Sequence, residues 1–180
     1  MIPALIFAAS AVILLVSALL LGRNLYRRGR HEAVGDWRIV ESIGHELSGL
    51  AGAAPLAGDL IHLARAELGF ALRPVRLREV LQAAVRRAAE RGVEVQVHEG
   101  GDPHIAADAD ALGHALDVAL RHAGAGSRVL LTTDGARAEV TLQMAFESRQ
   151  DVAVIRRIVQ AHRADFSSTE TEARLSFPLR

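Results

Sequence analysis

His45 and Glu46 are the neighbouring side chains of this sequence whose types could do chemistry together. An imidazole on a helix surface can accept a phosphoryl group on one ring nitrogen when an adjacent carboxylate orients or deprotonates the other. A zinc-protease motif is not formed, because Gly49 stands where that motif needs a second histidine. The pair therefore meets the local requirement for phosphoryl acceptance and predicts no metal site, although a plain surface histidine remains an equal alternative for His45.

Two helices over residues 37–72 are predicted to position this pair. Apolar residues recur at helical spacing on both sides of a break that contains Gly52 and Pro55. The first stripe is Ile39, Val40, Ile43 and Leu47, and the second is Leu56, Leu60, Leu63 and Ala64. A break this short predicts an antiparallel helical hairpin.

Residues 73–180 show helical and strand periodicities in turn. The apolar spacing predicts three helices, one from Leu77 to a closing Gly92, one over 108–123 and one over 151–162. It predicts strands over 93–97, 104–107, 128–133, 138–146 and 173–179. Asp108 is a predicted helix cap, and Asp134 with Gly135 a predicted hairpin turn. We expect an α/β two-layer sandwich with helices on one face of a mainly antiparallel sheet.

The N-terminal residues predict a location. Residues 2–21 are apolar apart from Pro3, Ser10 and Ser17, and they are long enough to cross a bilayer. Residues 1–22 therefore predict a transmembrane helix, followed by a linker over 23–36. A cleaved signal peptide is the competing interpretation, but no basic region precedes the apolar run. Arginines in the linker predict a single-pass protein of the inner (cytoplasmic) membrane with its C-terminal part in the cytoplasm.

Composition excludes several function classes. The 21 basic and 21 acidic residues balance, and only seven aromatic residues are present, so nucleic acid is not a predicted partner. The chain has no cysteine, which excludes disulfides and thiolate chemistry. Because it also has no lysine, a P-loop, a Schiff-base enzyme and a serine–lysine hydrolase are excluded.

Four motifs together resemble sensor histidine kinases: SIGHEL around His45, the run RPVRLREVLQAAVRRAAERGVEVQVHE, the helix ADADALGHALDVALRHA, and the helix DVAVIRRIVQAHRA. The resemblance implies a shortened dimerisation and phosphotransfer hairpin over 37–72, with His45 as phospho-acceptor and Glu46 as its orienting carboxylate. It implies a histidine-kinase ATPase-like (Bergerat-type) fold over 73–180. It also implies a homodimer whose partner is a response regulator or another histidine kinase.

The nucleotide-binding residues of that family are absent. Val118 and His122 stand at the two asparagine positions of its magnesium-binding helix, and Phe146 stands near the aspartate that anchors adenine. Residues 147–150 replace a lid of some twenty residues, and Asp151 replaces the glycine that opens the next helix, where a carboxylate repels phosphate. The domain over 73–180 is thus predicted to be degenerate, without ATP or any other cofactor.

Two functional hypotheses follow, and whether the chain is an enzyme stays uncertain at this point. In the first, the chain is a membrane-anchored two-component signalling protein that lacks its own ATP-dependent kinase activity and transfers phosphate through His45. In the second, it is a non-catalytic pseudokinase, a scaffold or dimerisation partner of a kinase or response regulator. His45 discriminates between them, because only the first hypothesis needs its imidazole.

Overall fold

The computed structural model describes residues 34–48, 54–121, 123–124, 126–146 and 148–179. These residues fall into two compact units that divide between Leu68 and Gly69. Within the described ranges, no helix combines the length and apolar character needed to span a membrane. The transmembrane helix predicted at 1–22 lies outside those ranges, and so does the linker up to residue 33.

Two helices form the described part of the first unit, α2 (Val34–Ser48) and α3 (Ala54–Leu68), and they pack against each other. Val40 and Leu47, from the predicted stripe of α2, are almost fully buried. The stripe predicted for α3 is partly wrong, since Leu56 is 37% exposed whereas Ala57 is fully buried. Small residues at the contact allow a closer approach of the two helices than leucines would.

Pro55 also differs from its predicted place. It was expected in the break between the helices, but it is the second residue of α3. A proline in the first helical turn loses no hydrogen bond, because the N–H groups there have no partner within the helix.

A five-stranded sheet is the centre of the second unit, with strand order β2-β4-β5-β7-β6, and β1 pairs with β3 in a separate ladder. The strands are β1 (Arg73–Arg76), β2 (Gln96–Glu99), β3 (His104–Ala107), β4 (Arg128–Asp134), β5 (Arg137–Gln143), β6 (Asp165–Ser168) and β7 (Glu172–Pro178). Only the β2–β4 pair of the large sheet is parallel. The predicted, mainly antiparallel sheet is confirmed.

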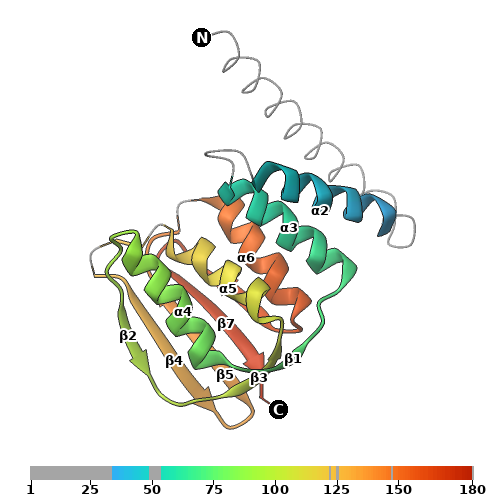
Figure 1. The fold of residues 1–180 in the computed structure, drawn as a ribbon. Helices are drawn as coiled ribbons and strands as arrows, with labels where there is room; N and C mark the ends of the chain where they lie inside the picture. The colour runs from blue at the N-terminus through green and yellow to red at the C-terminus, as the bar shows by residue number, and fades with distance from the viewer. Residues whose placement is uncertain (1–33, 49–53, 122, 125, 147, 180) are drawn as a thin grey trace, which may run out of the picture. The chain divides into compact units, whose positions relative to one another are not determined.

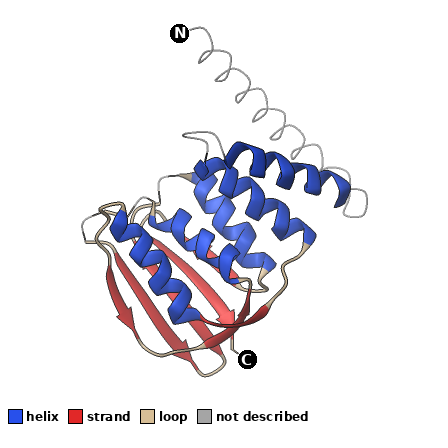
Figure 2. Cartoon of the chain, viewed as in Figure 1, coloured by secondary structure: helices blue, strands red, loops and turns tan. Residues whose placement is uncertain are grey.

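Three helices cover one face of this sheet: α4 (Leu77–Glu90), α5 (Ala109–Leu120) and α6 (Arg149–Ala161) (Figure 1). The layer of helices and the layer of strands make a two-layer α/β sandwich (Figure 2). The core lies between the layers, and its largest fully buried side chains include Leu81, Leu112, Leu116, Ile155, Ile158, Leu175 and Phe177. The predicted fold class is confirmed for residues 69–179.

Local signals in the sequence account for several element ends. The Asp108 carboxylate accepts a hydrogen bond from the Ala111 N–H at 3.0 Å and caps α5. Gly92 has a φ of +79° just after α4, a conformation that glycine adopts without strain. Gly135 has a φ of +49° in the turn between β4 and β5. All three were predicted for these roles.

Other boundaries differ from the prediction. β1 and β6 were not predicted, and the strand expected over 93–97 begins only at Gln96. In α6, Val154 is buried whereas Val152, expected to face inward, is only half-buried. Val152 instead lines a surface groove beside the β6–β7 turn.

Candidate functional site

His45 lies in the last turn of α2, and its side chain is exposed. Its backbone carbonyl accepts a hydrogen bond of 2.6 Å from the Ser48 hydroxyl, which closes the end of the helix. Glu46 follows in the same helix, but its side chain lies outside the described part of the chain. The imidazole is therefore accessible from solvent, as a phosphoryl acceptor requires, while the orienting role predicted for Glu46 stays a prediction.

The close approach of α2 to α3 positions His45. A Cβ atom placed on Gly44 would lie 2.7 Å from Cγ1 of Ile61 and 3.2 Å from the carbonyl oxygen of Ala57. Gly44 therefore faces α3 at a point where no larger residue fits without movement. The next residue is turned by about 100° around the helix axis, so His45 leaves the contact and reaches the surface.

The α5 helix carries no polar group at the first position where the resemblance implies an asparagine. Val118 stands there, and it is fully buried. His122, at the second such position, lies outside the described residues. An apolar side chain in the core has no lone pair to offer to magnesium or phosphate, so this position cannot contribute to a metal site.

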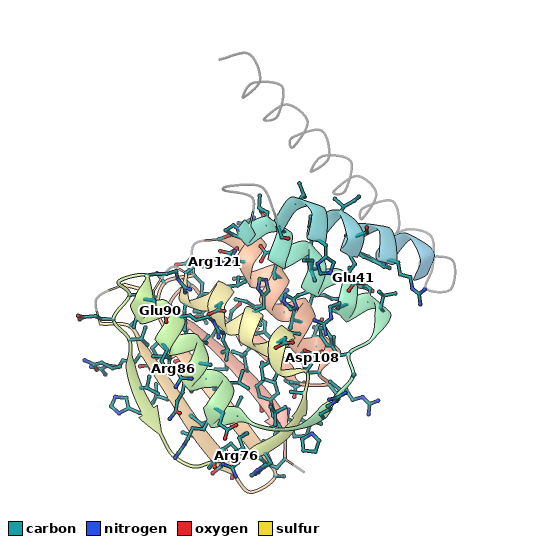
Figure 3. The ribbon with its side chains drawn as sticks, in the orientation of Figure 1. Glu41, Arg76, Arg86, Glu90, Asp108 and Arg121 are labelled. Carbon is teal, nitrogen blue, oxygen red and sulfur yellow. The ribbon has the colours of Figure 1, made fainter. Side chains whose placement is uncertain are left out.

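The beginning of α6 is closed by groups of the chain itself. The Ser148 hydroxyl accepts a hydrogen bond from the Asp151 N–H at 3.1 Å, which satisfies one of the free N–H groups of the first turn. The Asp151 carboxylate lies 3.9 Å from the guanidinium of Arg121, just beyond the end of α5. Figure 3 labels Arg121 at this end of α5 and Asp108 at the other.

Groups of the chain itself take up this helix end. The Asp151 carboxylate is paired with Arg121, and the Ser148 hydroxyl accepts a hydrogen bond from one N–H group of the first turn. Among the described residues, no group of three or more metal-binding side chains comes together. At Val118 and Asp151 the chain therefore has other residue types than the asparagine and the glycine that the family resemblance implies.

His162 is a buried polar residue that the sequence analysis placed only at the end of a helix. Its ring is 2% exposed and lies 4.6 Å from the ring of Phe70. Nδ1 donates to the Ile158 carbonyl at 2.7 Å, and Nε2 accepts from the Asp108 N–H at 3.1 Å. Burial lowers the pKa of His162, although its backbone hydrogen bonds and Asp108 oppose this effect.

The position of His162 makes its role structural. Its neutral ring connects the C-terminal end of α6 to the N-cap of α5. The sequence placed His162 only as the last residue of the predicted helix over 151–162. No pattern in the sequence showed that it would bond to the backbone of a residue 54 positions away.

Comparison with known proteins gives similarity in structure only, since no protein-family model and no curated protein matches the chain. The Acinetobacter baumannii histidine kinase AdeS has a TM-score of 0.54 at 12% identity, over 84% of this chain and 91% of that chain. A histidine kinase from Burkholderia phymatum has a TM-score of 0.48 at 18% identity, over 95% of this chain and 94% of that chain. The ATP-binding domain of PrrB from Mycobacterium tuberculosis has a TM-score of 0.47 at 22% identity, over 60% of this chain and 96% of that chain.

The similarity to AdeS establishes the fold. The α/β sandwich with its mixed sheet fits the ATPase-like fold of histidine kinases, as the sequence motifs predicted. Because fold does not determine function, the activity has to be argued from the residues at the site.

Proposed function

We propose that this chain is a membrane-anchored, histidine-kinase-like protein of two-component signalling that has no ATP-dependent kinase activity of its own. It accepts a phosphoryl group on His45 from a response regulator or a partner histidine kinase and passes it on to an aspartate. The observation that carries the proposal is the contrast between a retained kinase-like fold and the side chains at its nucleotide positions, buried Val118 and the Arg121–Asp151 ion pair.

The exposed imidazole supports the phosphotransfer step. The transfer is a displacement at phosphorus, in which a ring nitrogen of His45 forms the new P–N bond while the P–O bond to a receiver aspartate breaks. The aspartate leaves as a carboxylate, and the displaced proton of the imidazole goes to solvent or to a neighbouring base. The step is reversible and needs no nucleotide.

A scaffold function is the alternative. The two hairpin helices have 15 residues each, which gives a short surface for docking a receiver next to His45. A scaffold would still dimerise and hold a kinase or regulator at the membrane through the same helices. It would do so without any chemistry at His45.

Phosphoryl transfer to His45 tests the proposal. The full chain in lipid nanodiscs is mixed with receiver domains that carry a radiolabelled aspartyl phosphate, and acid-labile label on the chain is measured. We expect labelling of the unaltered chain and of His104→Ala, a matched control because His104 is another exposed histidine. His45→Ala should lose the label, since the nucleophile is gone, and labelled MgATP alone should leave the chain unlabelled.

Other labelling results would contradict the proposal. Equal labelling of His45→Ala and the unaltered chain would remove the acceptor role, and co-purification of the receiver with both would support the scaffold. Label from MgATP on the chain alone, retained by His104→Ala and lost with His45→Ala, would instead show an autokinase and contradict the proposal.

A further inference from the structure

A groove lies on one flank of α6, between this helix and the turn that joins β6 to β7. It has a volume of about 920 Å³. This size is within the range of about 300–1,000 Å³ that small-molecule sites occupy. Its lining comes from Ala145 and Phe146, which follow β5, from the first two turns of α6 and from residues 168–171.

The groove does not include the Arg121–Asp151 ion pair. Arg149, Val152 and Arg156 line it from α6, whereas Asp151 pairs with Arg121 just beyond the end of α5. At about 3.6 residues per turn, Asp151 projects from the side of α6 roughly opposite to Arg149 and Arg156. A ligand in the groove therefore does not meet the Asp151 carboxylate.

Hydrogen bonds hold the wall of the groove in place without a ligand. The Thr169 hydroxyl accepts from the Glu172 N–H at 3.1 Å, and the Thr169 N–H donates to the Glu172 carbonyl at 2.7 Å. The Phe146 N–H donates to the Glu170 carbonyl at 2.9 Å, which ties the segment after β5 to the same turn. A preformed wall lowers the entropy cost of binding.

The two arginines give the groove its charge. Both guanidinium groups are exposed, and within the described part of the chain neither takes part in an ion pair. The guanidinium of Arg156 lies 5.7 Å from the centre of the Phe166 ring, a cation–π contact that fixes its position. Among the described residues of the lining, Glu170 is the acidic one, so these residues carry two positive charges and one negative charge.

The rest of the lining combines four apolar residues with the hydroxyl residues Ser168, Thr169 and Thr171. Phe146, Val152 and two alanines provide a surface on which a ring or a short hydrocarbon chain can pack. Small-molecule sites commonly combine such a surface with a few polar groups that fix the orientation of the ligand. Arginine is suited to this task, since its fork of donors matches carboxylate and phosphate oxygens.

We propose that this groove binds a small organic anion with an aromatic or apolar body, whose acidic group is held by Arg156 and Arg149 and whose body packs on Phe146 and Val152. This inference does not depend on the phosphotransfer role of His45.

Calorimetric titration with 1-naphthyl phosphate tests the inference. The full chain in lipid nanodiscs is titrated, and empty nanodiscs give the background. We expect one saturable site per chain and binding at least about tenfold weaker for inorganic phosphate, which lacks the ring. Arg156→Gln should weaken the binding of 1-naphthyl phosphate about tenfold or more, because charge-assisted hydrogen bonds are lost.

Matched variants separate the groove from general charge effects. Arg149→Gln should weaken binding in the same direction, whereas Arg128→Gln removes an exposed arginine that does not line the groove and should leave the affinity unchanged. Because all three replace exposed side chains, circular dichroism should confirm that each variant is folded.

Three outcomes would overturn the inference: no saturable binding, an affinity that neither Arg149→Gln nor Arg156→Gln alters, or an equal loss with Arg128→Gln. His45→Ala should bind 1-naphthyl phosphate as the unaltered chain does. Failure of this site is therefore distinguishable from failure of the phosphotransfer proposal, which is measured on His45.

Discussion

His162 is the residue with the clearest pH-dependent role. Its Nε2 must be unprotonated to accept the Asp108 N–H, and its burial also disfavours the charged ring. The pKa of His162 is therefore lower in the folded chain than the ordinary value of 6.5 that applies when the chain is unfolded. As the pH falls below 6.5, the unfolded chain takes up this proton first, so the folded state loses stability.

This difference predicts that the free energy of unfolding falls as the pH decreases from about 7.5 to 5.5. The contribution of His162 is complete above 6.5 and is lost progressively below it. Urea unfolding of the full chain at a series of pH values measures the effect. His162→Gln should flatten this dependence and also lower stability at pH 7.5 by about 1–3 kcal/mol, because a buried N–H loses its acceptor.

His104→Gln is the control, since His104 is exposed on β3. The free energy of unfolding of His104→Gln should depend on pH as that of the unaltered chain does. A steep dependence that survives in His162→Gln would show that other groups cause it.

At the scale of elements, the contact between α2 and α3 depends on Gly44. Alanine normally stabilises a helix relative to glycine by about 1 kcal/mol. Here its Cβ would lie 2.7 Å from Ile61 Cγ1 and 3.2 Å from a backbone oxygen of α3. The side chain of Ile61 can move aside, but the Ala57 carbonyl can move only with its helix.

We therefore predict that Gly44→Ala destabilises the helical hairpin by about 1–3 kcal/mol, the usual cost of overpacking. Hydrogen exchange of the α2 and α3 amides in the full chain measures this loss of stability. Gly124→Ala is the control, because its Cβ would have no atom within 4 Å. If the α2 and α3 amides of Gly44→Ala exchanged at the same rate or more slowly, the two helices would accommodate the added methyl group without loss of stability, and the prediction would be wrong.

The same element scale shows what the sequence could predict. Repeated apolar residues identified α4, α5 and α6, and most of the residues expected to face inward are buried, such as Leu81, Leu112 and Ile158. The edge strand β6 was missed because its sequence, DFSS, has one apolar residue and is bonded on one side only, to β7. β1 was missed for a similar reason, since three of its four residues are exposed.

The sites were predictable to different degrees. The sequence identified His45 and located Val118 and Asp151, because each stands in a motif with neighbours at fixed spacing. It gave no indication of the groove beside α6. The groove depends on which residues of a distant turn lie opposite Arg149 and Arg156, and only the pairing of β6 with β7 determines that.

At the scale of the whole molecule, apolar side chains fill the core of the sandwich. Val118 fills space in that core, and the Arg121–Asp151 ion pair joins the ends of two helices. Replacing Val118 by asparagine would bury an amide where the present residue is fully buried, so one substitution does not restore a magnesium site.

The proposed absence of a magnesium–nucleotide site predicts that MgATP raises the melting temperature of the full chain no more than ATP without magnesium does. A ligand that binds only the folded state stabilises it by RT ln(1 + [L]/Kd), about 2.7 kcal/mol when its concentration is 100 times Kd. A thermal-shift titration with ATP up to about 5 mM should therefore show no rise of the midpoint that depends on magnesium, since buried Val118 offers no ligand atom and Asp151 is paired with Arg121. The groove gives a positive control, because 1-naphthyl phosphate should raise the same midpoint and Arg156→Gln should reduce that rise. If MgATP raised the midpoint and removal of magnesium abolished the rise, the nucleotide site would be functional and the proposed loss of kinase activity would be wrong.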